Sequence, residues 1–154
     1  MNVVAPARAL VLFSLLTATP SQNRPDFSGK WVPADVGQQP NVMTVTQDST
    51  TVTIVAPTGR GDPQRVTLKL DGSESTFTRL GPQMAPQAQI ARAFWQDNKL
   101  VITMDSYSGG EGAFTINLIW SLEGDTLLIE TVRTSTTGKT LHRSELRYTR
   151  EQKR

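Results

Sequence analysis

The chain has 154 residues, of which 16 are basic and 14 acidic, giving a formal net charge of +2. A chain of this length is expected to form one domain. Its nearly balanced charge provides no long-range field that would recruit nucleic acid. The sequence contains no cysteine, which excludes disulfides, a lipid-modified cysteine anchor and thiol chemistry. A fold built from this chain must be held together by packing and backbone pairing.

The amino-terminal segment has the three-part order of a secretory signal peptide. Arg8 makes the amino end positive, an apolar run covers Ala9–Ala18, and small or turn-forming residues continue to Ser21. Such a run is too short to cross roughly 30 Å of hydrocarbon as a helix. We expect residues 1–21 to be a signal peptide, cut after Ser21 or after Ala18, with an amino-terminal membrane anchor or a disordered tail as the alternatives. The mature form would then have no transmembrane span and would be periplasmic or secreted.

From Phe27 onward, apolar and polar residues alternate, which is the pattern of half-buried antiparallel strands. Short turns such as Asp48-Ser49, Asp97-Asn98 and Gly124-Asp125 separate these runs. A first strand contains Gly29 and Trp31. The later strands are expected, in chain order, at Val42–Gln47, Thr51–Ala56, Arg65–Leu70, Ala91–Gln96, Lys99–Asp105, Ala113–Leu122, Thr126–Val132 and Ser144–Arg150.

The strand pattern predicts an all-β fold for residues 22–154 as one domain. The single helical candidate, Pro86–Phe94, is short and runs into a strand pattern, so it is interpreted as a loop followed by a strand. About nine or ten sequential hairpin strands form an antiparallel up-and-down meander. Because a twisted sheet of this size tends to curl and closure removes its edges, we expect a barrel or a half-barrel.

The motif Phe27-Ser28-Gly29-Lys30-Trp31 opens the folded part. Gly29 allows close backbone approach, and Trp31 can fill one end of a barrel. A Gly-x-Trp on the first strand, with an arginine of the last strand across the indole, is the pattern of lipocalins and related calycin barrels, which this sequence resembles. Arg150 shares the inward parity of Leu146 and Tyr148, so it is the preferred partner of Trp31, with Arg147 second. Such a cation–π stack contributes about 0.5–2 kcal/mol.

Four blocks in the same order extend this resemblance over most of the chain: PDFSGKWV, LKLDGSEST, FWQDNKLVIT and WSLEGDTLLIETVRTSTTGK…RYTRE. They look like a group of small exported bacterial proteins that are called lipocalin-like and begin Asp-Phe-Ser-Gly-x-Trp. The resemblance implies a lipocalin-like β-barrel and an exported, bacterial location. It implies no catalytic residue.

The inventory of reactive side chains argues against an enzyme. His142 is the only histidine, which with the lack of cysteine excludes His-based metal clusters and Cys–His nucleophiles. A Ser-His-Asp triad would need His142, yet no Gly-x-Ser-x-Gly elbow supplies the serine. Asp105 and Glu130 have the parity of outward, solvated positions, whereas an acid–base pair needs contrasting environments. We therefore expect no catalytic residue, no metal and no cofactor.

A small apolar molecule is the partner that a barrel interior favours. Trp95, Phe114 and Trp120 lie on strands expected to be neighbours, so they are the candidates for a ligand pocket. The glycine-rich loop before Phe114 would lie at the barrel mouth, with Tyr107 and Glu111 as its rim groups. An interior filled by side chains is the alternative.

Two functional hypotheses follow. The first is an exported, non-enzymatic binding protein that holds a small apolar ligand. The second is a cell-envelope structural or protein-interaction module with a filled core. A hydrated cavity lined by the three aromatic residues would favour the first hypothesis, and a filled interior with an exposed apolar patch would favour the second.

Overall fold

A computed structural model describes residues 24–35, 42–58, 62–80, 86–110 and 112–151, which form ten strands and no helix. Consequently, none of these residues belongs to a helix that could cross a membrane. The proposed signal peptide and Glu111 lie outside the described residues. The strands are β1 (Gly29–Pro33), β2 (Met43–Gln47), β3 (Thr51–Ala56), β4 (Gln64–Lys69), β5 (Asp71–Leu80), β6 (Pro86–Gln96), β7 (Lys99–Ser108), β8 (Gly112–Glu123), β9 (Thr126–Ser135) and β10 (Thr140–Arg150).

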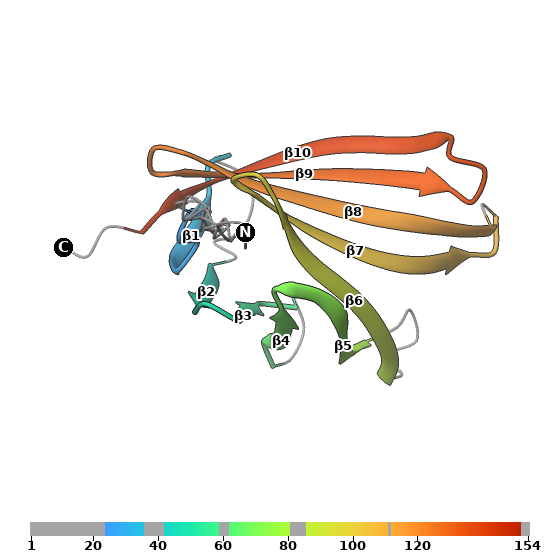
Figure 1. Ribbon diagram of the computed structural model, residues 1–154, viewed down its shortest axis with the longest axis horizontal. Helices are drawn as coiled ribbons and strands as arrows, with labels where there is room; N and C mark the ends of the chain where they lie inside the picture. The colour runs from blue at the N-terminus through green and yellow to red at the C-terminus, as the bar shows by residue number, and fades with distance from the viewer. Residues whose placement is uncertain (1–23, 36–41, 59–61, 81–85, 111, 152–154) are drawn as a thin grey trace, which may run out of the picture.

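All ten strands belong to one antiparallel sheet with the order β4-β3-β2-β1-β10-β9-β8-β7-β6-β5. The first and last strands pair with each other, and the sheet curls until its two edge strands, β4 and β5, lie side by side (Figure 1). At this seam, side chains connect the edges. The backbone N–H of Lys69 donates to Ser75 Oγ at 3.0 Å, and Gln64 Nε2 donates to the Thr78 carbonyl at 3.1 Å. The predicted up-and-down barrel is confirmed, and it is nearly closed.

The strands differ in length around the barrel. Strands β1 to β4 have five or six residues, whereas β5 to β10 have 10 to 12. The long strands β7 to β10 therefore project beyond the short ones (Figure 1). We call the end where β1 begins the sealed end and the opposite one the open end. The turns β2–β3, β4–β5, β6–β7 and β8–β9 lie at the sealed end, since successive strands alternate in direction.

The predicted strand alternation is present in the burial of side chains. In β7, Leu100 and Ile102 are buried and face inward, whereas Asp105 is exposed on the outer face. The segment that begins at Pro86 corrects one expectation: it is strand from its first residue, paired with Leu80 of β5. Proline is tolerated at the first position of a strand, and β5 supplies the partner that the sequence pattern did not reveal.

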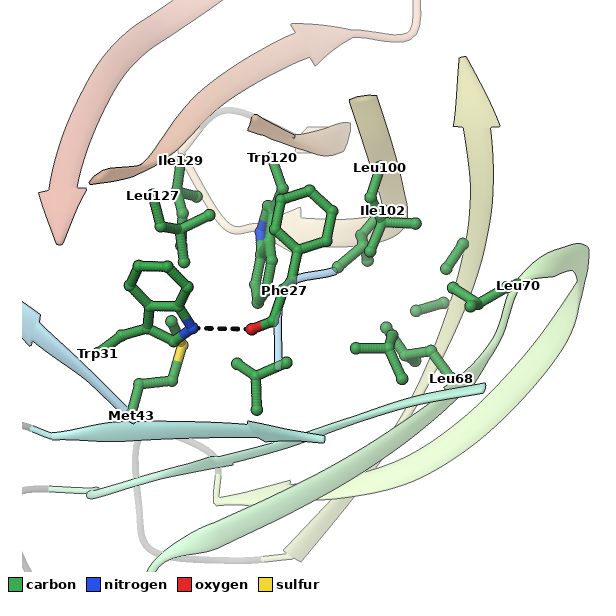
Figure 2. Packing of buried hydrophobic residues seen from close by; sticks show 14 residues of the cluster. Phe27, Trp31, Met43, Leu68, Leu70, Leu100, Ile102, Trp120, Leu127 and Ile129 are labelled. Carbon is green, nitrogen blue, oxygen red and sulfur yellow. Dashed lines mark hydrogen bonds between the residues drawn. The ribbon is translucent and has the colours of Figure 1, made fainter. Parts of the chain in front are cut away.

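The hydrophobic core lies toward the sealed end. There, the backbone N–H of Leu70 donates to the carbonyl of Thr50 at 2.8 Å, which ties the β4–β5 turn to the β2–β3 turn. Large inward side chains fill this end of the barrel (Figure 2). The core cluster consists of Phe27, Trp31, Met43, Val45, Val52, Leu68, Leu70, Ala91, Ala93, Leu100, Ile102, Trp120, Leu127 and Ile129.

Candidate functional site

Residues 24–28, which precede β1, close the sealed end. The backbone N–H of Phe27 donates to Gln47 Oε1 at 3.1 Å, and Gln47 Nε2 donates to the Pro25 carbonyl at 3.0 Å. Ser28 Oγ accepts the backbone N–H of Gln47 at 2.9 Å. Gln47, at the end of β2, thereby holds the entering chain at three points. The side chain of Phe27 is 0% exposed as a result.

Three aromatic rings surround Phe27 in this end of the barrel. Its ring stacks on Trp95 with centroids 5.9 Å apart and meets the edge of Trp120 at 5.7 Å. Trp31 Nε1 donates to the Phe27 carbonyl at 2.8 Å in a buried hydrogen bond (Figure 2). The guanidinium carbon of Arg24 lies 5.3 Å from the centroid of the Trp95 ring. This packing leaves the sealed end filled with protein.

Arg150 completes the sealed end from the last strand. It pairs with Trp31 in the β1–β10 register, and its guanidinium carbon lies 4.5 Å from the indole centroid. The same guanidinium donates to the Ser28 carbonyl and, at 3.4 Å, to the Asp26 carbonyl. The stack expected from strand parity is therefore present. Arg147 instead forms an ion pair with Glu145 at 2.9 Å.

Gly29 has a more specific role than close backbone approach. Its φ is +144°, a conformation that side-chain-bearing residues rarely adopt. A Cβ atom at this position would lie 3.0 Å from Arg150 Nη1. The glycine therefore makes room for the arginine that stacks on Trp31.

Asp26 and Tyr148, which lie near this end, have shifted pKa values. A hydrogen bond from the Ser28 hydroxyl, and then one from its backbone N–H at 2.8 Å, hold the pKa of Asp26 below its ordinary value. The nearby charge of Arg150 acts in the same direction. Burial raises the pKa of the Tyr148 phenol. These shifts accompany local structure, because hydrogen bonds to Ser28 and burial of the phenol are their largest causes.

An apolar cavity of about 230 Å³ lies between the β4–β5 seam and the inner faces of β7 and β8. Eight of its lining side chains are apolar, and three are polar. The polar residues are Gln64 at the start of β4, Arg79 at the end of β5 and Gln89 near the start of β6, so all three lie toward the open end. The apolar residues are Ile54, Val66, Leu68, Phe77, Ala91, Ile102, Met104 and Leu118.

The three aromatic residues expected to line a pocket are not among the residues that line this cavity. Trp95 and Trp120 pack against Phe27 in the sealed end. Phe114 lies toward the open end, where the Arg133 guanidinium stacks 4.2 Å from its ring centroid. The physical reason is Phe27: it enters from outside the sheet and occupies the space between the tryptophans. The cavity is displaced toward the seam.

The rim of the open end includes one of the two predicted groups. Tyr107 is 74% exposed, close to the β7–β8 turn. It borders a groove together with Gln87, Gln89, Asp105 and Ser106. Glu111, the other predicted rim group, lies outside the described residues.

The acidic residues considered for catalysis lie on the outer face. Asp105 accepts a hydrogen bond from Thr115 Oγ1 at 3.0 Å, and Glu130 forms an ion pair with Arg143. Among the described residues, no group of three or more His, Asp or Glu side chains is placed to hold a metal ion.

Sequence reasoning missed Phe27 and the cavity residues of β5. Phe27 stood in the quoted motif four positions before Trp31, yet only the fold shows that its ring turns inward. For Phe77 and Arg79, alternation from Ser75 was the available signal, since Ser75 and Phe77 share one parity.

A comparison with protein-family models and with curated proteins finds no match to this chain.

Proposed function

We propose that this chain is an exported, non-enzymatic binding protein of lipocalin-like type that holds a small apolar molecule. The observation that carries the proposal is the cavity of about 230 Å³ with eight apolar lining side chains. The sealed end is filled, whereas this space beside the seam is not. The fold analogy to lipocalins agrees with the proposal.

The size of the cavity sets the size of the ligand. An apolar cavity of about 150 Å³ holds benzene, and sites for drug-sized molecules begin near about 300 Å³. A ligand between these limits has an eight-carbon chain or two small rings. Burying seven or eight carbon groups is worth about 6 kcal/mol. The costs of association reduce this gain, so we expect a dissociation constant weaker than about 0.1 mM for such a simple chain.

The first experiment is native mass spectrometry of the mature domain, exported by a bacterial host and never denatured, followed by solvent extraction. We expect a retained mass that disappears on extraction. A second experiment uses calorimetric titration with 1-octanol on the wild type and on Ala91→Phe, which places a ring in the cavity. Ala91 is buried and lines the cavity, so this variant should lose octanol binding.

Ala88→Phe is the matched control, because Ala88 is exposed and lies on the same strand with the opposite parity. It should bind octanol as the wild type does. A clean apo mass together with octanol binding that is absent, or equal in both variants, contradicts the proposal.

A second candidate function is supported by the outer face of β6. Ile90 and Phe94 are 48% and 39% exposed there, and both are large and apolar. They are the kind of residues that a protein-interaction module would present. This function would be favoured if the wild type retains a protein partner, if Ile90→Ser and Phe94→Ser each lose that partner, and if the cavity holds no small molecule.

A further inference from the structure

We infer that the ligand of this cavity is an anionic amphiphile, with an apolar chain or ring and one carboxylate or comparable anionic group, and that Arg79 binds this group. The inference rests on the proposed function and adds a chemical class to it. Its basis is the distribution of charge between the two faces of the barrel wall.

The inward positions of the described strands contain no Asp or Glu. Strand pairing shows this directly: Glu74 pairs with Arg92 on the outer face, whereas the next pair, Ser75 and Ala91, is buried inside. The same alternation places Asp105, Glu123, Glu130 and Glu145 outside. A register shift between Asp71 and Glu74 puts Asp71 opposite Phe94, which also lies on the outer face.

Three arginines, in contrast, occupy inward positions of the same strands. Arg150 stacks on Trp31 at the sealed end, and Arg133 stacks on Phe114 toward the open end. Arg79 follows Phe77 at inward parity on β5 and lines the cavity itself. The described inward strand positions therefore carry three arginines and no carboxylate, although the chain as a whole has a charge of only +2.

Arg79 lies where an anionic head group of a bound amphiphile would be. Gln64 and Gln89, the other two polar lining residues, share the open end of the cavity with it. Gln64 Nε2 donates across the seam to the Thr78 carbonyl at 3.1 Å, immediately beside Arg79 in the chain. An apolar chain would extend from this polar end past Phe77 and Met104 toward Leu68 and Ile102.

Physical chemistry favours an anion at this position over a neutral or cationic group. Arg79 is exposed, so an anion beside it stays in contact with water and gains a partner charge, and no carboxylate at the described inward strand positions competes for the guanidinium. The planar guanidinium presents paired N–H donors that match a carboxylate. A cationic amphiphile of the same length would be repelled by Arg79, the only arginine that lines the cavity.

The test compares octanoate, 1-octanol and octylammonium by calorimetric titration at neutral pH. In the wild type, octanoate should bind most tightly and octylammonium most weakly. Arg79→Gln keeps a polar side chain but removes the charge. This variant loses a hydrogen bond to a charged group, whose contribution is reduced by solvent exposure, so octanoate should bind about 5- to 20-fold more weakly. Octanol binding should stay within about twofold of the wild-type value.

Arg65→Gln is the matched control. Arg65 lies next to Gln64 on β4 but is exposed on the outer face. Its substitution therefore removes the same charge without changing the lining of the cavity. The head-group assignment is overturned if Arg79→Gln leaves octanoate binding unchanged, or if both variants weaken it equally. In that case, octanol binding would still support the cavity as a ligand site. Absence of binding for all three probes overturns the proposed function and this inference together.

Discussion

Replacement of Trp31 tests whether the sealed end holds the barrel together. Trp31 is 0% exposed, donates its indole N–H to the Phe27 carbonyl and carries Arg150 on its face. Truncation of a buried tryptophan to alanine costs about 3–5 kcal/mol. For a domain whose free energy of unfolding is about 5–15 kcal/mol, Trp31→Ala should therefore remain folded but be severely destabilised.

Two milder variants separate the contributions. Trp31→Phe retains an aromatic ring but leaves the Phe27 carbonyl without its donor, which costs about 1–3 kcal/mol. Arg150→Met removes the charge on the indole and the hydrogen bonds to the Ser28 and Asp26 carbonyls. In a double-mutant cycle, Trp31 and Arg150 should show a coupling energy of about 0.5–2 kcal/mol.

Urea unfolding followed by far-ultraviolet circular dichroism is the suitable assay, because it does not depend on tryptophan fluorescence. Phe94→Ala is the control, since this aromatic residue lies on the outer face at 39% exposure. It should cost less than about 1 kcal/mol. A loss below about 1 kcal/mol for Trp31→Ala, or additive effects of the Trp31 and Arg150 changes, would refute the role assigned to the sealed end.

Four further variants test the rest of the site. Phe27→Ala should cost about 3–5 kcal/mol in urea unfolding, and a cost no larger than that of Phe94→Ala would contradict its central position among the rings. Gly29→Ala should cost about 1–3 kcal/mol from backbone strain and displacement of Arg150, whereas Gly109→Ala, with no atom within 4 Å of its added Cβ, should be nearly neutral. The pKa of Asp26 is lowered in the folded state, so its contribution to stability is complete above its ordinary pKa of about 3.9 and is lost as pH falls through the folded pKa. Asp26→Asn should therefore make the melting temperature less sensitive to acid below about pH 4. An unchanged acid profile would count against the Ser28 hydrogen bonds. The pKa of Tyr148 is raised in the folded state, so its contribution to stability is complete below about pH 10 and is lost as pH rises through the folded pKa. Tyr148→Phe should therefore reduce the loss of stability above about pH 10. An alkaline stability profile identical to that of the wild type would argue against burial as the cause of the shift.

The amino-acid sequence by itself determined the class of fold and much of the strand order. Alternation is a local property, because successive side chains of a strand point to opposite faces. It therefore placed Leu100 and Ile102 inside and Asp105 outside without knowledge of the neighbours. Short turns made sequential antiparallel pairing the natural outcome. The parity of the last strand was sufficient to select Arg150 for Trp31.

Only the tertiary structure decided where the interior is filled and where it is hollow. Phe27 comes from a segment before the first strand, and its position depends on hydrogen bonds to Gln47 some 20 residues away. The cavity depends on which strands become the edges of the sheet, here β4 and β5. Periodicity reports the face of each residue but not its height along the barrel or the strand opposite it. For that reason Trp95 and Trp120 had the correct inward direction, while the space beside Arg79 could be found only once the sheet had closed.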